Sequence, residues 1–265
     1  SLAIEPTRVV PLSIRTDALI ELGRYEQGFA TAQRRLELRP DLASYSRASY
    51  ARELVGDRAG AVRLMRMAVA ASAPFSGERA TARAQLGLVL LAQGDLDAAE
   101  REVRTALAEV PGDANATFVR AQVLVARGRL RQALPLFERV AAALPEPDHL
   151  FFLAETERAL GRTADARRHE AAMRRAFALL EANGQDVDLD RALFEADLRR
   201  PTAADIARAR RGRAARPGIA GDHALGWVLT RAGRCGEADR HATRSLRLGT
   251  RDPLMLFHAA MSTAC

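Results

Sequence analysis

A chain of 265 residues in which 48% of the side chains are hydrophobic can bury a core, which excludes wholesale disorder. Aromatic residues make up only 5%, and Ala, Leu and Arg recur throughout, so the composition favours helices over strands. The formal net charge is +7, and every one of the 40 basic residues is arginine. These arginines are spread over the whole chain without an aromatic platform or finger motif, so the sequence predicts no nucleic-acid partner. No apolar stretch approaches the ~20 residues that span a bilayer, so no transmembrane segment is predicted.

Prolines and glycines recur at intervals typical of helical hairpin repeats. Pro6, Pro40 and Pro74 are spaced by 34 residues, and so are Pro111 and Pro145. A second series has spacings of 33, 38, 34 and 33 residues and consists of Gly23, Gly56, Gly94, Gly128 and Gly161. Glycine supplies a left-handed cap at the end of one helix, and proline stops the next helix. Each interval therefore predicts two antiparallel helices.

The predicted hairpins follow one another along the chain, and the third and fourth are the clearest. In these two, small residues would let the paired helices approach closely: Gly87, Ala99, Ala121 and Ala133. The other units are rougher, and in chain order their predicted elements fall within residues 22–40, 45–68, 150–184, 189–198, 202–215, 224–238 and 254–265. Because one hairpin cannot bury its apolar stripe alone, neighbouring hairpins must stack. We therefore predict an all-α fold of stacked antiparallel helix hairpins.

The third unit resembles the tetratricopeptide repeat (TPR) in every small position and in most apolar ones. The residues that carry the resemblance are Leu86, Gly87, Gly94, Leu96, Ala99, Val103, Ala106 and Pro111. The unit departs from the repeat at two aromatic positions, which hold Arg83 and Leu90. The resemblance implies a right-handed α-solenoid in which residues 1–265 form a single array of about seven hairpin units. It also implies a concave face, lined by the first helix of each hairpin, that holds peptides.

Shorter stretches resemble a bacterial set of TPR proteins from high-GC, actinobacterial-like organisms. They include Leu22-Gly23-Arg24-Tyr25-Glu26 and residues 182–184, 187–189, 192–197 and 248–252. Similar proteins often carry an exported or membrane-anchored N-terminus. The resemblance therefore implies an extracytoplasmic or envelope-anchored protein, with a cytoplasmic location as the alternative.

Both ends of the sequence look like interrupted repeats. Residues 1–6 resemble the end of a second helix, and Cys265 comes before any second helix of its unit. A finished solenoid needs polar capping elements, and neither end has the sequence of one. We therefore expect an internal piece of a longer protein, with uncapped ends through which copies could associate.

No short catalytic motif occurs in the chain: a nucleophile elbow, a Walker A loop, a zinc-protease helix and a dinucleotide glycine fingerprint are all absent from the sequence. His223, His241 and His258 lack the spacing of zinc ligands. The acidic run 186–190 lacks the glycine and glutamate of a calcium loop, which favours helix capping around Gly184. We therefore predict no enzyme activity, no cofactor and no metal.

Two further features have a structural and a functional interpretation. Arginines crowd one predicted second helix, at Arg208, Arg210, Arg211, Arg213 and Arg216. They could meet phosphate or an acidic protein, but a solvated outer face is favoured. Cys235 falls at a helix-packing position, where a small apolar side chain is expected, and the spacing of the two cysteines implies no disulfide framework.

Alignment of the helix-ending glycines places one set of side chains near the lining of the concave face. The predicted peptide-binding residues are Asp17, Tyr50, Leu88, Phe118, Gln122, Phe151, Glu155, His223 and Trp227. Phe118 and Trp227 are the aromatic anchors of this prediction, although each could instead pack between helices. We predict a non-catalytic scaffold or adaptor that binds a protein or peptide. The alternative is a regulatory or sensor segment of a larger signalling protein or enzyme whose catalytic or DNA-binding part lies outside this chain.

Overall fold

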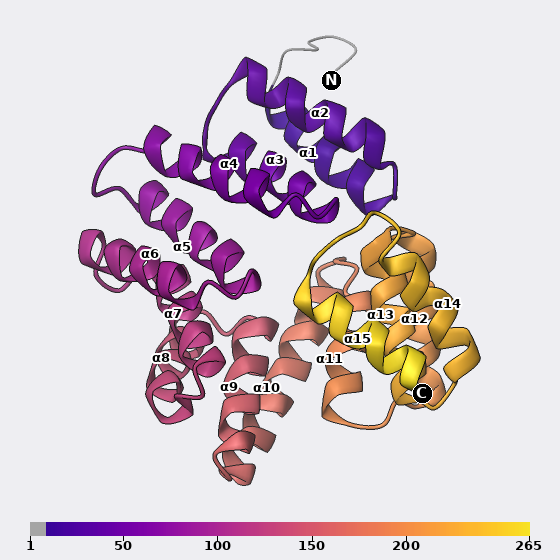
Figure 1. Ribbon diagram of the computed structural model, residues 1–265. Coiled ribbons are helices and arrows are strands. Elements are labelled where there is room, and N and C mark those ends of the chain that lie inside the picture. Colours follow the sequence, from indigo (N-terminus) through magenta and orange to yellow (C-terminus); the bar gives the residue numbers. More distant parts are fainter. Residues whose placement is uncertain (1–8) are drawn as a thin grey trace. The chain divides into compact units, whose positions relative to one another are not determined.

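The computed structural model describes residues 9–265, and every regular element in that range is an α-helix (Figure 1). The predicted all-α fold of helix hairpins is confirmed. The repeat end predicted at Pro6 lies outside the described residues. The helices found between residues 9 and 265 are α1 (Val9–Glu21), α2 (Tyr25–Leu38), α3 (Leu42–Leu54), α4 (Arg58–Ala71), α5 (Gly77–Ala92), α6 (Leu96–Glu109), α7 (Ala114–Ala126), α8 (Leu130–Ala143), α9 (Pro147–Ala159), α10 (Thr163–Ala182), α11 (Asp188–Leu198), α12 (Ala203–Ala215), α13 (Ile219–Arg231), α14 (Cys235–Ser245) and α15 (Pro253–Ala264). None of these helices is both long and apolar enough to cross a membrane.

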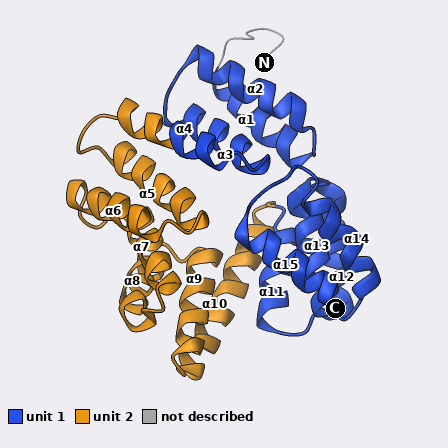
Figure 2. Ribbon diagram, in the orientation of Figure 1, with its two compact units in different colours: residues 1–64, 186–265 blue, residues 65–185 orange. Residues whose placement is uncertain are grey.

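The chain divides into two compact units (Figure 2). Unit 1 contains the residues up to Leu64 together with Asp186–Cys265, and unit 2 contains Met65–Gln185. Unit 2 is therefore one continuous stretch of chain, and both of its ends connect to unit 1. The single array expected for residues 1–265 stays a prediction.

The turn of the third hairpin shows why its two helices end and begin where they do. Gly94 adopts a φ of +79°, a left-handed conformation that other residues rarely adopt. This conformation lets the Asp95 N–H donate to the Leu90 carbonyl at 3.0 Å, which satisfies a carbonyl at the end of α5. The Asp95 carboxylate then accepts the Ala98 N–H at 3.0 Å and caps α6. The predicted glycine cap is confirmed at this turn.

Helices α5 and α6 pack closely because their contact contains small residues. A Cβ added at Gly87 would lie only 2.8 Å from Val103 Cγ1. Arg83 stands where the repeat usually has a large aromatic side chain, and it forms ion pairs with Glu102 at 2.7 Å and with Glu109 at 3.2 Å. Two carboxylates of the facing helix therefore accommodate this polar replacement inside the hairpin.

In unit 1, the first hairpin of the chain packs against helices from the other end of the sequence. The buried side chains of Ile20, Tyr25, Leu54 and Ile219 form one apolar cluster. The Tyr25 Oη accepts the Ile219 N–H at 2.6 Å. Ile219 is the first residue of α13, where backbone N–H groups have no partner inside the helix. The repeat pattern predicts contacts between neighbouring hairpins only, so this contact was not predicted.

A disulfide joins Cys235, the first residue of α14, to Cys265 after the end of α15. The two Cα atoms are 5.3 Å apart, and the cysteines are separated by 30 positions in the sequence. The prediction that Cys235 serves as a small apolar packing residue without a disulfide is therefore wrong. A separation of this size matches no short cysteine motif. The two sulfurs meet because α15 packs against both α13 and α14.

Candidate functional site

Five of the nine predicted peptide-binding residues lie in unit 2, on the first helices of three successive hairpins. Leu88 belongs to α5, Phe118 and Gln122 belong to α7, and Phe151 and Glu155 belong to α9. We call these five residues the helix-A strip. Leu88 is 46% exposed, and the other four side chains are partly buried. Three successive hairpins of unit 2 therefore supply apolar, aromatic and polar side chains that solvent can reach.

Phe118 is the centre of an aromatic cluster. Its ring makes edge-to-face contacts with Phe137, Phe152 and the His149 imidazole, at centroid distances of 5.7, 5.4 and 4.6 Å. Phe137 is fully buried, whereas Phe118 and Phe152 keep part of their surface exposed. Phe118 thus packs between helices and also reaches solvent. Phe152 was not among the predicted residues. Adjacent residues of a helix point to different faces, so placing Phe151 on the lining could have indicated that Phe152 packs toward a neighbouring helix.

Gln122 presents an unsatisfied polar atom. Its Oε1 is buried and has no hydrogen-bond donor among the described residues. A buried amide oxygen without a donor costs about 1–3 kcal/mol, so a donor that reached it would be stabilising. Glu155 differs in this respect, because Arg158 donates to its carboxylate and also to that of Glu170. Gln122 is therefore a residue of the strip whose amide oxygen would gain a donor from a bound chain if the side chain turned this buried atom outward.

Charged side chains of the neighbouring hairpins form ion pairs within unit 2. Arg120 lies 3.6 Å from Glu100, and Arg127 lies 2.7 Å from Asp97. Because these side chains are already paired with each other, they are less available to a charged ligand. Binding at the helix-A strip would therefore depend on apolar surface and on the Gln122 amide more than on ion pairs.

The remaining four predicted residues lie in unit 1, and two of them are buried. The Trp227 ring stacks on His258 with centroids 3.7 Å apart, and its Nε1 donates to Asp197 Oδ1 at 2.7 Å. His223 is also buried, and its Nε2 lies 2.8 Å from His258 Nδ1. Burial lowers the pKa of His223, which favours its neutral form. Of the two interpretations of Trp227, the structure supports packing between helices.

The other two predicted residues of unit 1 lie at its surface. Both oxygens of the Asp17 carboxylate accept hydrogen bonds from Arg47, at 2.9 and 2.6 Å. Tyr50 is 43% exposed. In unit 1, His223 and Trp227 therefore both contact His258 in the core. Asp17 and Tyr50 lie at the surface and do not belong to this buried cluster.

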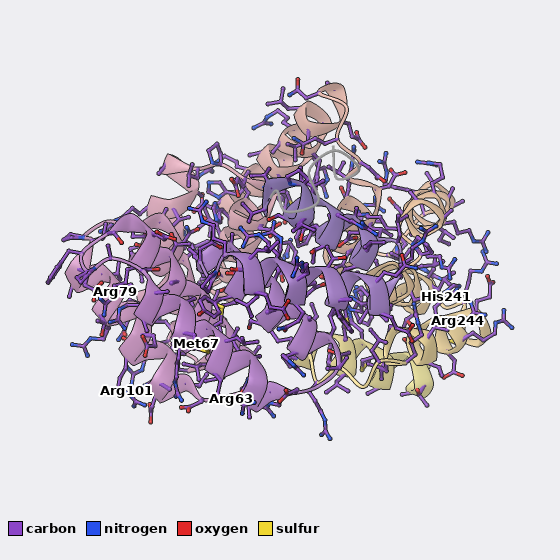
Figure 3. The ribbon with its side chains drawn as sticks, turned by 90° about the horizontal axis from the view of Figure 1, so that it is seen from above. Arg63, Met67, Arg79, Arg101, His241 and Arg244 are labelled. Atoms are coloured by element: carbon purple, nitrogen blue, oxygen red, sulfur yellow. A yellow bond between two sulfur atoms is a disulfide. The ribbon has the colours of Figure 1, made fainter. Side chains whose placement is uncertain are left out.

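The arginines that crowd α12 pair with carboxylates of the same unit. The ion-pair distances are 2.7 Å for Arg208–Asp188, 2.9 Å for Arg210–Glu237, 3.2 Å for Arg211–Asp188, 3.1 Å for Arg213–Asp222 and 3.2 Å for Arg216–Asp190. These arginines are therefore paired and do not form a free basic patch. Arg210 and Arg211 remain exposed, as a solvated outer face predicts, whereas the other three are partly buried. Other arginines do project into solvent, such as Arg101 of α6 and Arg244 of α14 (Figure 3).

The acidic run 186–190 supplies partners for these arginines and helps to start α11. The Asp186 carboxylate accepts the Asp188 N–H at 3.0 Å, at the first residue of the helix. Gly184 adopts a φ of +79° directly after α10, as the predicted cap requires. The predicted glycine cap is therefore confirmed, but the expected aspartate cap is not, because the residue at the N-cap of α11 is Val187 and its side chain makes no capping hydrogen bond. Ion pairing is a second role of this segment that was not predicted.

Three family models, each described as tetratricopeptide repeat, match the chain over residues 51–114, 90–151 and 147–169. The matched residues include the whole helix-A strip. No curated protein matches the sequence.

Among solved structures, a thermophilic TPR protein of Thermus thermophilus is similar with a TM-score of 0.56 and 22% identity, over 72% of this chain and 99% of its own. PilF of Pseudomonas aeruginosa is similar with a TM-score of 0.53 and 14% identity, over 84% of this chain and 90% of its own. At these identities the likeness shows the fold alone.

Proposed function

Because the chain is a tetratricopeptide repeat protein, we propose that it is a non-catalytic scaffold that holds an extended peptide of a partner protein on the helix-A strip of unit 2. The observation that carries the proposal is a combination of features on successive helices of one unit. Leu88 is exposed, Phe118 is partly exposed within an aromatic cluster, and the Gln122 amide oxygen lacks a donor among the described residues.

An extended peptide has the chemistry that these three residues require. It presents side chains that can cover Leu88 and Phe118, and each residue except proline carries a backbone N–H that could donate to Gln122 once the buried amide oxygen turns toward the peptide. Aromatic side chains at an interface bury large areas and often contribute most of the binding free energy. The neighbouring ion pairs of unit 2 favour an apolar peptide over a strongly charged one.

Selection of peptides followed by titration of variants tests this proposal. Random peptides displayed on phage are selected against the full chain, and an enriched peptide is labelled and titrated by fluorescence polarisation. Gln122→Ala should weaken binding about fivefold, the equivalent of one hydrogen bond. Leu88→Glu should weaken it by more than about tenfold, because it places a charge against the apolar side chains of the peptide.

Leu179→Glu is the matched control, because Leu179 is 64% exposed on α10 and does not belong to the strip. We expect this variant to bind as the wild type does. Failure to enrich any peptide, or full affinity in both strip variants, would refute the assignment.

A further inference from the structure

Helix α15 carries no charged side chain, yet only one of its sides is covered within the described chain. His258 and Ala259 are buried against unit 1. On the other side, Leu254 is 49% exposed, Phe257 is 56% exposed and Met261 is 43% exposed. These three positions, spaced by three and four residues, share one helix face. Large apolar side chains that are exposed together on one helix face give that face the character of an interaction site.

The exposure of this face does not come from a loosely attached helix. The disulfide between Cys265 and Cys235 holds the C-terminal end of α15 on α14. In the middle of the helix, the His258 ring stacks on Trp227 with centroids 3.7 Å apart. Unit 1 therefore presents the apolar side chains of α15 on an anchored element.

The C-terminal half of α3 lies beside the start of α15. Leu54 and Met255 belong to one apolar cluster. Just beyond α3, the Gly56 backbone approaches the Gly249 carbonyl so closely that an added Cβ would lie 2.3 Å from that oxygen. Tyr50, one helical turn before Leu54, is 43% exposed. Its ring therefore extends the surface from α15 onto α3.

Glu53 brings to this surface a carboxyl group that the described residues leave without a counter-charge. Its carboxylate accepts the Ser49 hydroxyl at 3.4 Å, and it forms no ion pair with any residue between 9 and 265. Burial raises the pKa of Glu53 to about 7; the Ser49 hydrogen bond lowers it, and the charge of Asp252 raises it again. A partly desolvated carboxylate of this kind is costly until a cation approaches it.

The charges that act on Tyr50 are also negative. Partial burial raises the pKa of its hydroxyl, and the carboxylates of Glu21, Glu53 and Asp252 raise it further. Near the junction of α3 and α15, the surface therefore combines exposed apolar side chains with the carboxyl groups of Glu53 and Asp252.

We propose that this surface binds a basic amphipathic segment of a partner protein. We call it the α3–α15 face, and it consists of Tyr50, Glu53, Asp252, Leu254, Phe257 and Met261. Apolar side chains of the segment cover α15, and a lysine or arginine of the segment supplies the counter-charge of Glu53 and Asp252. The α3–α15 face belongs to unit 1 and shares no residue with the helix-A strip of unit 2.

Model peptides provide the first test. The probe is a labelled amphipathic helix of about 14 residues, or roughly four turns, built from leucine and lysine. One matched peptide has glutamate in place of lysine, and another has serine in place of leucine. In fluorescence polarisation titrations of the oxidised full chain, the leucine–lysine peptide should bind on the order of tenfold more tightly than either matched peptide.

Two variants locate the binding. Glu53→Gln removes the carboxyl group that a lysine of the peptide would hold in its ionised form, and Phe257→Ser removes apolar surface. Each should weaken the binding of the leucine–lysine peptide about fivefold to tenfold. Glu37→Gln and Leu179→Ser change exposed residues outside the face and should leave the affinity unchanged.

Stability measurements separate loss of binding from loss of folding. The folded-state pKa of Glu53 is raised from 4.5 to about 7, so the wild type loses stability relative to Glu53→Gln as the pH rises between these two values. The variant should therefore bind the peptide more weakly while its melting temperature at neutral pH is no lower than that of the wild type.

Several outcomes would overturn the proposal. Equal binding of the leucine–glutamate peptide would contradict the proposed charge complementarity. Unchanged affinity in both variants would mean that the peptide does not bind to the α3–α15 face. A dimer that excludes the peptide, detected by sedimentation, would mean that a second copy of the chain covers α15. An affinity that falls with Leu88→Glu but not with Glu53→Gln would assign the peptide to the helix-A strip instead.

Discussion

His258 lies between two rings in the core of unit 1. Its imidazole stacks on Trp227, and its Nδ1 lies 2.8 Å from Nε2 of His223. Burial, with a further contribution from His223, lowers the pKa of His258 to about 3. The hydrogen bond between the two imidazoles needs one donor and one acceptor, so it cannot survive protonation of both rings. The packing of α15 on α13 is therefore coupled to pH through this pair.

We expect acid to weaken unit 1 through His258. Because its folded-state pKa lies below the ordinary value of 6.5, its contribution to the free energy of unfolding is complete above pH 6.5 and is lost as the pH falls toward about 3. At about pH 4, roughly 2.5 pH units below the ordinary pKa, the loss should be on the order of 3 kcal/mol. Denaturant titrations of the wild type and of His258→Phe, at neutral and acidic pH, measure this loss. The phenyl ring can keep the stack on Trp227 but cannot be protonated, so equal acid sensitivity of the two proteins would contradict the prediction.

Among the elements, α15 is joined to its neighbours covalently as well as by packing. The disulfide closes a loop whose ends are 30 positions apart, and a cross-link of this span stabilises a fold by about 3 kcal/mol, chiefly by restricting the unfolded chain. Disulfides persist in oxidising compartments, which agrees with the location outside the cytoplasm that the bacterial resemblance implies. That location stays a prediction.

Reduction of the disulfide should loosen α15 before other helices. We expect the double substitution Cys235→Ser and Cys265→Ser to lower the free energy of unfolding by about 2–4 kcal/mol. Hydrogen exchange followed by mass spectrometry should show faster exchange over Pro253–Ala264, while α7 in unit 2 serves as the internal control. If α15 exchanges at the same rate in both proteins, packing alone anchors the helix.

How much of an element can be predicted from sequence depends on how local its determinants are. The end of α5 could be predicted because Gly94 and Asp95 act on adjacent residues. The pairing of Cys235 with Cys265 could not, because it requires the packing of α15 on α14. For Trp227, the same spacing fits a lining residue and a packing residue, so only its three-dimensional contacts distinguish them.

At the scale of the whole molecule, both ends of the sequence share polar contacts inside unit 1. The buried Asp222 carboxylate accepts hydrogen bonds from Arg213 at 3.1 Å, His241 at 2.9 Å and Arg247 at 3.0 Å. The Arg247 guanidinium also lies 5.6 Å from the centroid of the Tyr25 ring, which connects this group to the first hairpin. A repeat pattern specifies only how each hairpin meets the next one, so it contains no information about such a contact.

Tyr25→Phe tests whether the first hairpin holds α13. The Ile219 N–H lies in the first turn of α13, so loss of the Tyr25 oxygen would leave this donor unsatisfied at a cost of about 1–3 kcal/mol. Hydrogen exchange should therefore accelerate at the start of α13, although the substitution lies 194 positions away. In a stack whose hairpins touch only their neighbours, the effect would stay within the first hairpins. Tyr45→Phe, at a buried tyrosine of α3, is the matched control and should leave exchange at Ile219 unchanged. Equal exchange in the wild type and in Tyr25→Phe would mean that the start of α13 does not depend on the Tyr25 hydrogen bond.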